Sequence, residues 1–533
     1  MELVKKQIHM NQFKGNVATQ ITLDDDFIVP DSMEDMAQVL LSTGEIQMDA
    51  VKNQGEKVTV KGKLDFWVLY RREGGGLLTL GGSIPFDEVI NAPGLEEKDF
   101  VGLGWTLEDL SAEMINSRKL GVQAIVSFEV RIETLRDVEA AVDVAQSYGG
   151  YGKNVDLLEP SEALPQVLKK GVSVAAIAVR RKDTYRLKEE LTLTGGKPNI
   201  DRLLWRELKL RDMSVKPLDG QIHLAGELSI FAIYQAEGEG SVVQWIEELL
   251  PFSGELVLDQ AKEEMIPMVS VRLAHKELEP KPDYDGEMRQ LDVDAVLELD
   301  VKLYEEQELE LLEDIYSVSK EIDVTRASAC FDRLLAKNAC KCRVSEKLEL
   351  SGAEHILQIC RSDGTVKVDE VELLEDGIKI DGVLEVSLLY LTNDDEAPIQ
   401  AALRQVPFSY SADVRNITPK SIYQLNPGLE QLSAVMLGGD KVELKAVLSL
   451  DLLVLAPECQ DVIVGVEQRE LDLEKLQDMP GIVGYVVQKE DTLWKIAKAF
   501  HTTMESVMEV NELTGETLEA GQRLLVMKEV VDE

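Results

Sequence analysis

The chain contains few of the residues from which disulfide frameworks, metal sites and nucleophilic active sites are built. Among its 533 residues are five cysteines, five histidines and 5% aromatic residues. So few cysteines in a long chain indicate a reducing compartment rather than a fold stabilised by disulfides. No apolar run reaches the roughly eighteen residues of a membrane-spanning helix, and the opening MELVKKQIHMNQFKGN lacks the apolar core of a secretion signal. We therefore expect a cytoplasmic protein without membrane insertion.

Basic residues are also scarce relative to acidic ones. Lysine and arginine number 56 against 98 aspartates and glutamates, which gives a formal net charge of −42. Phosphate backbones and anionic lipids would repel such a chain, so the charge argues against nucleic-acid partners. It favours cationic partners, or simply keeps an abundant protein soluble. A hydrophobic content of 44% suits globular folding, and at about 100–200 residues per domain the chain holds several domains.

One strand pattern occurs three times along the chain. Gly62–Tyr70, Gly226–Tyr234 and Gly382–Tyr390 each run from glycine to tyrosine over the same spacing, with apolar residues at every second position. A period of two is typical of a half-buried β-strand. An aliphatic-Pro-Phe segment follows each copy and is expected at a strand start or a sheet edge, because proline cannot donate to a central ladder. These segments are Ile84–Phe86, Leu250–Phe252 and Val406–Phe408. A long alternating strand then closes each copy, centred on Ala124, Ala295 and Ala446.

The shared spacing predicts one fold used three times. We expect a mostly β protein with three tandem antiparallel, β-rich, sandwich-like domains, followed by a small βααβ domain. The predicted β-rich domains are residues 1–135, 172–310 and 318–470, and the small domain is residues 482–533. Residues 136–171 are predicted to be a linker with a short helix, and residues 471–481 a second linker.

The last fifty or so residues read as a complete small domain. Tyr485 and Val487 alternate in a first strand, and Asp491 is a plausible N-cap for the helix that follows. Thr502-Thr503-Met504-Glu505 reads as a capping box that opens a second helix. Gly521 then turns the chain into a second strand.

This pattern resembles a LysM domain, a βααβ module that binds N-acetylglucosamine polymers. The resemblance covers Tyr485-x-Val487, Asp491-Thr492-Leu493, Ile496-Ala497, Asn511, Gly521-Gln522 and Leu524. It implies peptidoglycan binding through Asp491, Thr492, Leu493, Asn511, Leu513 and Gly515. Glu490 stands where the family usually has a glycine, and it crowds the loop that grips sugar in the family.

The tripled strand pattern resembles the SPOCS domain of endospore-forming bacteria. Tandem SPOCS domains with one C-terminal LysM domain are similar to spore-coat morphogenetic proteins of the SipL/SpoVID type. That resemblance implies a scaffold that tethers the coat to the forespore surface from the mother-cell side. It also implies that the LysM domain docks to SpoIVA, the ATP-hydrolysing protein of the coat basement layer.

The first helix of the small domain offers a candidate protein-binding patch. Leu493, Ile496, Ala497 and Phe500 recur at the spacing of a buried face. Trp494, Lys495 and Lys498 fall off that face and are predicted to point outward, and aromatic residues dominate protein interfaces. The alternative is that Trp494 folds back on the linker against Ile482, in a domain short of core.

We identify no enzyme in the sequence. The histidines are scattered, and the glycine-rich segments lack the Lys-Ser/Thr of a phosphate-binding loop. Cys340-Lys341-Cys342 resembles half of a metal motif, which His355 and Cys360 complement only loosely. Three hypotheses stay open at this point: an adaptor without cofactor that binds a coat protein, a peptidoglycan-binding protein, and an enzyme with its site in the β-rich domains.

Overall fold

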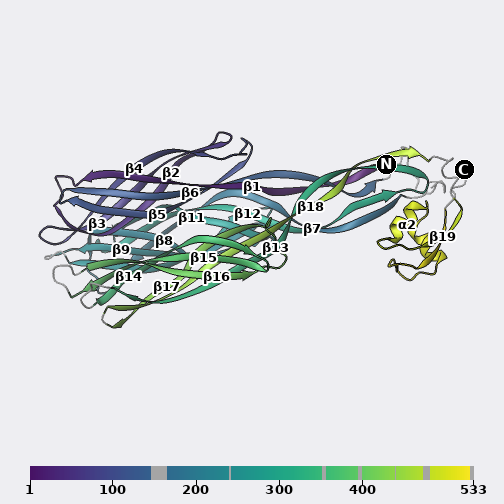
Figure 1. The fold of residues 1–533 in the computed structure, drawn as a ribbon. Helices are drawn as coiled ribbons and strands as arrows, with labels where there is room; N and C mark the ends of the chain where they lie inside the picture. The colour runs from purple at the N-terminus through teal and green to yellow at the C-terminus, as the bar shows by residue number, and fades with distance from the viewer. Residues whose placement is uncertain are drawn as a thin grey trace.

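Strands build almost the whole molecule, which confirms the predicted mostly β fold (Figure 1). The computed structural model describes residues 1–145, 165–238, 242–350, 356–393, 399–438, 440–471 and 480–528. Repeat 1 contains β1 (Glu2–Ile28), β2 (Met36–Asn53), β3 (Lys57–Arg72), β4 (Leu77–Asn91), β5 (Phe100–Asn116) and β6 (Lys119–Ala145). Repeat 2 contains β7 (Gln166–Thr192), β8 (Ile200–Leu218), β9 (Gln221–Ala236), β10 (Val243–Val257), β11 (Ile266–Pro282) and β12 (Met288–Tyr316). Repeat 3 contains β13 (Lys320–Glu349), β14 (Ile356–Leu374), β15 (Gly377–Thr392), β16 (Ile399–Asp413), β17 (Ile422–Gly438) and β18 (Lys441–Glu470).

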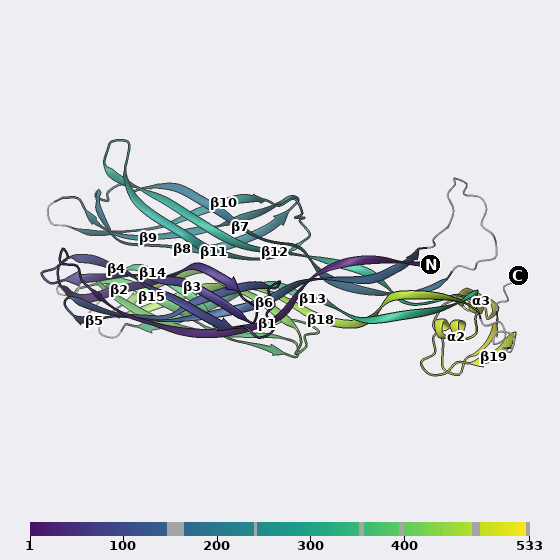
Figure 2. The ribbon, with the colours of Figure 1, turned by 90° about the horizontal axis from the view of Figure 1, so that it is seen from above.

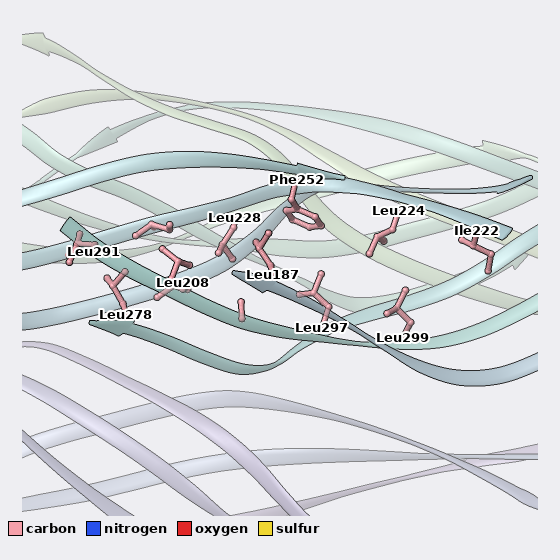
Figure 3. Packing of buried hydrophobic residues seen from close by; sticks show 14 of the residues in the cluster. Leu187, Leu208, Ile222, Leu224, Leu228, Phe252, Leu278, Leu291, Leu297 and Leu299 are labelled. Atoms are coloured by element: carbon pink, nitrogen blue, oxygen red, sulfur yellow. The ribbon is translucent and has the colours of Figure 1, made fainter. Parts of the chain in front are cut away.

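The six strands of each repeat form two three-stranded antiparallel sheets. In repeat 1 the strand orders are β2-β3-β4 and β1-β6-β5, and the equivalent orders recur in repeats 2 and 3. The alternating apolar residues of the Gly-to-Tyr strand enter the core between the two sheets. In repeat 2, Leu228 of β9 shares this core with Leu297 and Leu299 of β12 (Figure 3). Each repeat is therefore the sandwich-like unit that the sequence predicted.

The repeated glycine makes room for the repeated phenylalanine. Gly62 lies opposite Phe86, and Gly382 lies opposite Phe408, in the register of neighbouring strands. A Cβ atom placed on either glycine would lie 2.8 Å from the phenyl ring and closer still to a backbone oxygen. The prolines of the same motif lie in β4, β10 and β16, which are edge strands, as expected for residues that cannot donate.

The three repeats pack against one another through their Gly-to-Tyr strands. The residues before the repeated tyrosines are Leu69, Ile233 and Leu389, and all three lie in one buried cluster with Trp205 and Phe231. These strands are therefore buried on both faces at this end. We call the packed sandwiches of the three repeats the body.

The long strands continue out of the body in pairs and form a stalk (Figures 1 and 2). The stalk comprises residues 1–14, 133–145, 166–178, 304–335 and 455–470. Each of the pairs β1–β6, β7–β12 and β13–β18 has two register shifts at matching places, one near the body and one toward the tip. Such bulges increase the local twist of a ribbon and re-aim its side chains. The three ribbons then bury a core of their own that includes Ile8, Val138, Val174, Leu311, Phe331 and Val462.

The predicted linker of residues 136–171 differs from the structure. Residues 136–145 belong to β6 and residues 166–171 to β7, while residues 146–164, which include the SYGGYGKN segment, lie outside the described residues. Strand β12 likewise runs beyond the predicted boundary at residue 310. These strand ends were missed because they are buried in the stalk rather than in the sandwich of their own repeat.

One pair of cysteines forms a disulfide, although the sequence predicts a reducing compartment and no disulfide framework. Cys330 of β13 and Cys459 of β18 lie opposite each other in the ladder and are bonded through sulfur. The two residues are separated by 129 positions, so their pairing left no spacing signal in the sequence. Both belong to the stalk.

No helix in the described part of the chain is long and apolar enough to cross a membrane.

Candidate interaction site on the terminal domain

The terminal domain follows the stalk and has the predicted βααβ order. It contains β19 (Ile482–Val486), α2 (Leu493–Ala499), α3 (Met504–Val510) and β20 (Arg523–Met527). The caps differ from prediction by one residue each. Thr492, not Asp491, caps α2 by accepting from Lys495 N at 3.2 Å, and Thr503, not Thr502, caps α3.

Trp494 does not point into solvent, contrary to prediction. It is only 5% exposed, and the ring of Tyr316 meets it edge-on with centroids 4.8 Å apart. The indole Nε1–H donates to Asp314 Oδ2 at 2.9 Å. Asp314 and Tyr316 belong to the end of β12 at the tip of the stalk. The ring thus folds back on its own chain, but on the stalk rather than on Ile482.

Lys498 binds the same carboxylate. Its Nζ lies 2.8 and 2.7 Å from the two oxygens of Asp314. Burial raises the pKa of Asp314, but the hydrogen bonds from Lys498 and Trp494 outweigh it and lower the pKa overall. Tyr316 completes the contact by donating its hydroxyl to Thr502 O at 2.9 Å. Asp314 and Tyr316 are functional candidates that sequence reasoning missed, since they lie about 180 residues from their partners.

The other predicted contact residues lie away from the stalk. Lys495 is exposed and donates from Nζ to Glu490 O at 3.0 Å. Ile482 is 61% exposed on β19. Val486, Leu525 and Met527 are also exposed, and strand register places them with Ile482 on the outer face of the β19–β20 sheet. The four residues predicted as one patch therefore do not lie together, because Trp494 and Lys498 contact the stalk whereas Ile482 lies on the outer face of the sheet.

The predicted sugar-binding residues are largely committed to the fold of the domain. Asp491 accepts from Tyr485 OH and Gln488 N, both at 2.7 Å. Asn511 donates to Val507 O and Leu525 O and accepts from Leu525 N. Leu493 is 1% exposed, Leu513 is half-buried against the core, and Gly515 is exposed. Glu490 adopts a φ of 77°, the left-handed conformation that a glycine would take more easily.

A buried charge cluster joins repeat 1 to repeat 2 at the base of the stalk. Glu133 of β6 is 1% exposed, and both its carboxylate oxygens lie 2.8 Å from Lys302 Nζ of β12. Arg131 and Arg180 each approach the same carboxylate at 2.8 Å. Burial opposes ionisation of Glu133, but the three cations outweigh burial and lower its pKa to about 2. One carboxylate therefore holds three cations in place.

A cavity of about 1530 Å³ lies beside this cluster, between the three repeats. Arg131 and Lys302 line it, together with segments of β5, β11, β14 and β17. Acidic side chains such as Asp300, Asp369 and Glu370 line it as well. Because both signs of charge are present, the lining does not select one class of ligand.

The three remaining cysteines are buried thiols. Cys340 and Cys342 lie in the core of repeat 3, and Cys360 lies in the cluster between the repeats. Burial raises the pKa of Cys342 and raises that of Cys360 to about 11, the opposite of what activates a nucleophile. His355 lies outside the described residues, and within them no three metal-ligating side chains come together.

Comparison with known families matches both parts of the chain. The family described as "SipL, SPOCS domain" matches residues 35–115, 199–281 and 355–437, and the LysM domain family matches residues 485–526. The chain belongs to the SipL-type family of tandem SPOCS proteins with a C-terminal LysM domain. No curated protein matches it. Each SPOCS match spans four strands, such as β2–β5, and leaves out the two long strands that build the stalk. SPOCS and LysM domains are non-catalytic binding domains, so the chain is a sporulation-related scaffold that bears a LysM domain.

Proposed function

We propose that this protein is a non-enzymatic adaptor in endospore coat assembly, which tethers coat layers to the forespore surface on the mother-cell side. The SPOCS body and stalk act as the scaffold. The LysM domain binds a protein of the coat basement layer, the SpoIVA-type ATPase that the family resemblance implies. The proposed contact residues are Ile482 and Lys495, which are exposed, together with Trp494 and Lys498, which the stalk covers.

The exposed apolar face of the LysM sheet carries this proposal. Four large apolar side chains share that face, led by Ile482 at 61% exposure, on a domain of few residues. Exposed apolar groups gathered on one face mark protein interaction sites. The polar groups of Asp491 and Asn511, which would serve a sugar, are occupied by internal hydrogen bonds. Both observations favour a protein ligand over a glycan.

Peptidoglycan binding is the alternative function, because the LysM family match itself favours it. It would use Asp491, Thr492, Leu493, Asn511, Leu513 and Gly515. Gly515 is exposed, and a Cβ atom placed on it would meet nothing within 4 Å, so a ligand could approach its backbone.

The two functions are separated by binding assays on the full chain. We expect wild-type protein to retain the basement-layer ATPase from a lysate of sporulating cells and not to sediment with insoluble peptidoglycan. Ile482→Ser should abolish retention because it removes the most exposed side chain of the apolar face. Val510→Ser, at an exposed apolar residue of α3, is the matched control and should bind normally. Sedimentation with peptidoglycan, together with normal ATPase binding by Ile482→Ser, would contradict the proposal.

A further inference from the structure

Part of the proposed contact surface of the LysM domain is already occupied by the chain itself. Trp494 and Lys498 both bind the carboxylate of Asp314, and the Tyr316 ring covers the indole. Tyr316 and Val318 even belong to the same buried cluster as the LysM core residues. An external protein could reach Trp494 only after this segment of the stalk had moved away.

The geometry of the segment shows how the stalk fills this face. Asp314 and Tyr316 are two residues apart in an extended strand, so both side chains leave the same side of it. Ile315 between them is fully buried in the core of the stalk. The register shift between Leu312 and Asp314 sets this phase and aims the pair at the LysM domain.

We propose that residues Asp314 and Tyr316 act as a built-in competitor for the LysM domain. The face made by Trp494, Lys498 and the backbone of Thr502 recognises an extended strand that carries a carboxylate followed two residues later by a tyrosine. The stalk tip supplies that pair in cis, and a coat protein that presents the same pair displaces it. This inference rests on the proposed function, because it concerns a protein ligand of the same domain.

Competition in cis has a defined physical consequence. A tethered segment acts at an effective concentration of about millimolar, so it holds the face against weak or dilute ligands. The apparent affinity for an external ligand equals the intrinsic affinity multiplied by the fraction of molecules in which the face is open. Arg326 of β13 also pairs with Asp314, at 3.3 Å, and it stays with the stalk. The released carboxylate therefore keeps one cation, which lowers the cost of opening.

The test uses the full chain and a labelled peptide of residues 311–319, LLEDIYSVS. Fluorescence anisotropy would compare wild type with the double variant Asp314→Asn/Tyr316→Ala. We expect the peptide to bind the double variant at least about tenfold more tightly, because its face is no longer occupied in cis. Glu313→Gln is the matched control, since the side chains of Trp494 and Lys498 bond to Asp314 and not to this neighbour, and it should behave as wild type.

Two further measurements assign the binding to the proposed face. Lys498→Glu placed in the double variant should abolish peptide binding, as should a peptide with the same asparagine and alanine replacements. Circular dichroism would verify that each variant is folded. Equal binding of the peptide to wild type and double variant, absence of binding to a folded double variant, or binding unaffected by Lys498→Glu would each overturn the inference. Failure of the proposed function shows separately, as absence of ATPase retention.

Discussion

Neutralising Glu133 should weaken the junction between repeats 1 and 2 strongly. Glu133→Gln keeps the size of the side chain but leaves Lys302, Arg131 and Arg180 without their shared carboxylate. Removing one partner from a buried ion pair costs about 3–5 kcal/mol. The lowered pKa of Glu133 points in the same direction. A fall from 4.5 to about 2 corresponds to about 3 kcal/mol of stability at neutral pH. We expect a loss in this range.

The pH dependence identifies the carboxylate as the cause. Because folding depresses the pKa of Glu133, its contribution is present above pH 4.5 and is lost as the pH falls toward about 2. The difference between wild type and Glu133→Gln should therefore be full at pH 7 and shrink below pH 4.5. Urea unfolding followed by tryptophan fluorescence would measure it. Glu129→Gln, at an exposed residue of the same strand, is the control and should stay within about 0.5 kcal/mol of wild type. A Glu133→Gln variant as stable as this control at pH 7 would refute the reasoning.

Three further outcomes follow from other parts of the molecule. Gly382→Ala should destabilise repeat 3 by about 1–3 kcal/mol in thermal unfolding, because the new Cβ would clash with the backbone and a phenyl ring. Gly171→Ala is the control and should be tolerated, because a Cβ there would lie in open space. Cys330→Ser should lower stability by about 2–4 kcal/mol in non-reducing buffer and leave it unchanged under reduction, since the effect acts through the bond to Cys459. Asn511→Ala removes three hydrogen bonds and should lower the free energy of unfolding of the LysM domain by about 2–3 kcal/mol. Calorimetry should show this as a lower unfolding temperature of that domain.

The local elements of the fold could be predicted because each repeat carries its own signals. The alternation between Gly62 and Tyr70 depends only on which side of a strand faces the core, and that information lies within nine neighbouring residues. The LysM helices were predictable for the same reason, apart from a shift of one residue at each cap. Periodicity therefore identified the strands, the number of repeats and the sandwich-like units.

The contacts between repeats could not be predicted in this way. Trp494 falls off the apolar face of α2, so the periodicity of the helix predicts that it faces solvent. It is instead buried by a strand that belongs to another part of the chain. Apolar and polar residues alternate in residues 138–145 much as they do in the rest of β6. This alternation predicts a strand, but it does not predict that the strand continues beyond the sandwich of its own repeat. The alternation of one segment shows that it has a buried face and does not show what covers that face.

The lengthwise run of the strands bears on how a tether would carry load. Strand β18 passes from the body to the tip of the stalk, and along its length it is paired with β13 and, in the body, with β17. Its hydrogen bonds lie across the strand direction. A pull on the LysM domain away from the body would therefore strain many of these bonds at once in shear, instead of opening them one after another from an end. A molecule built in this way would yield at its terminal domain before its scaffold came apart.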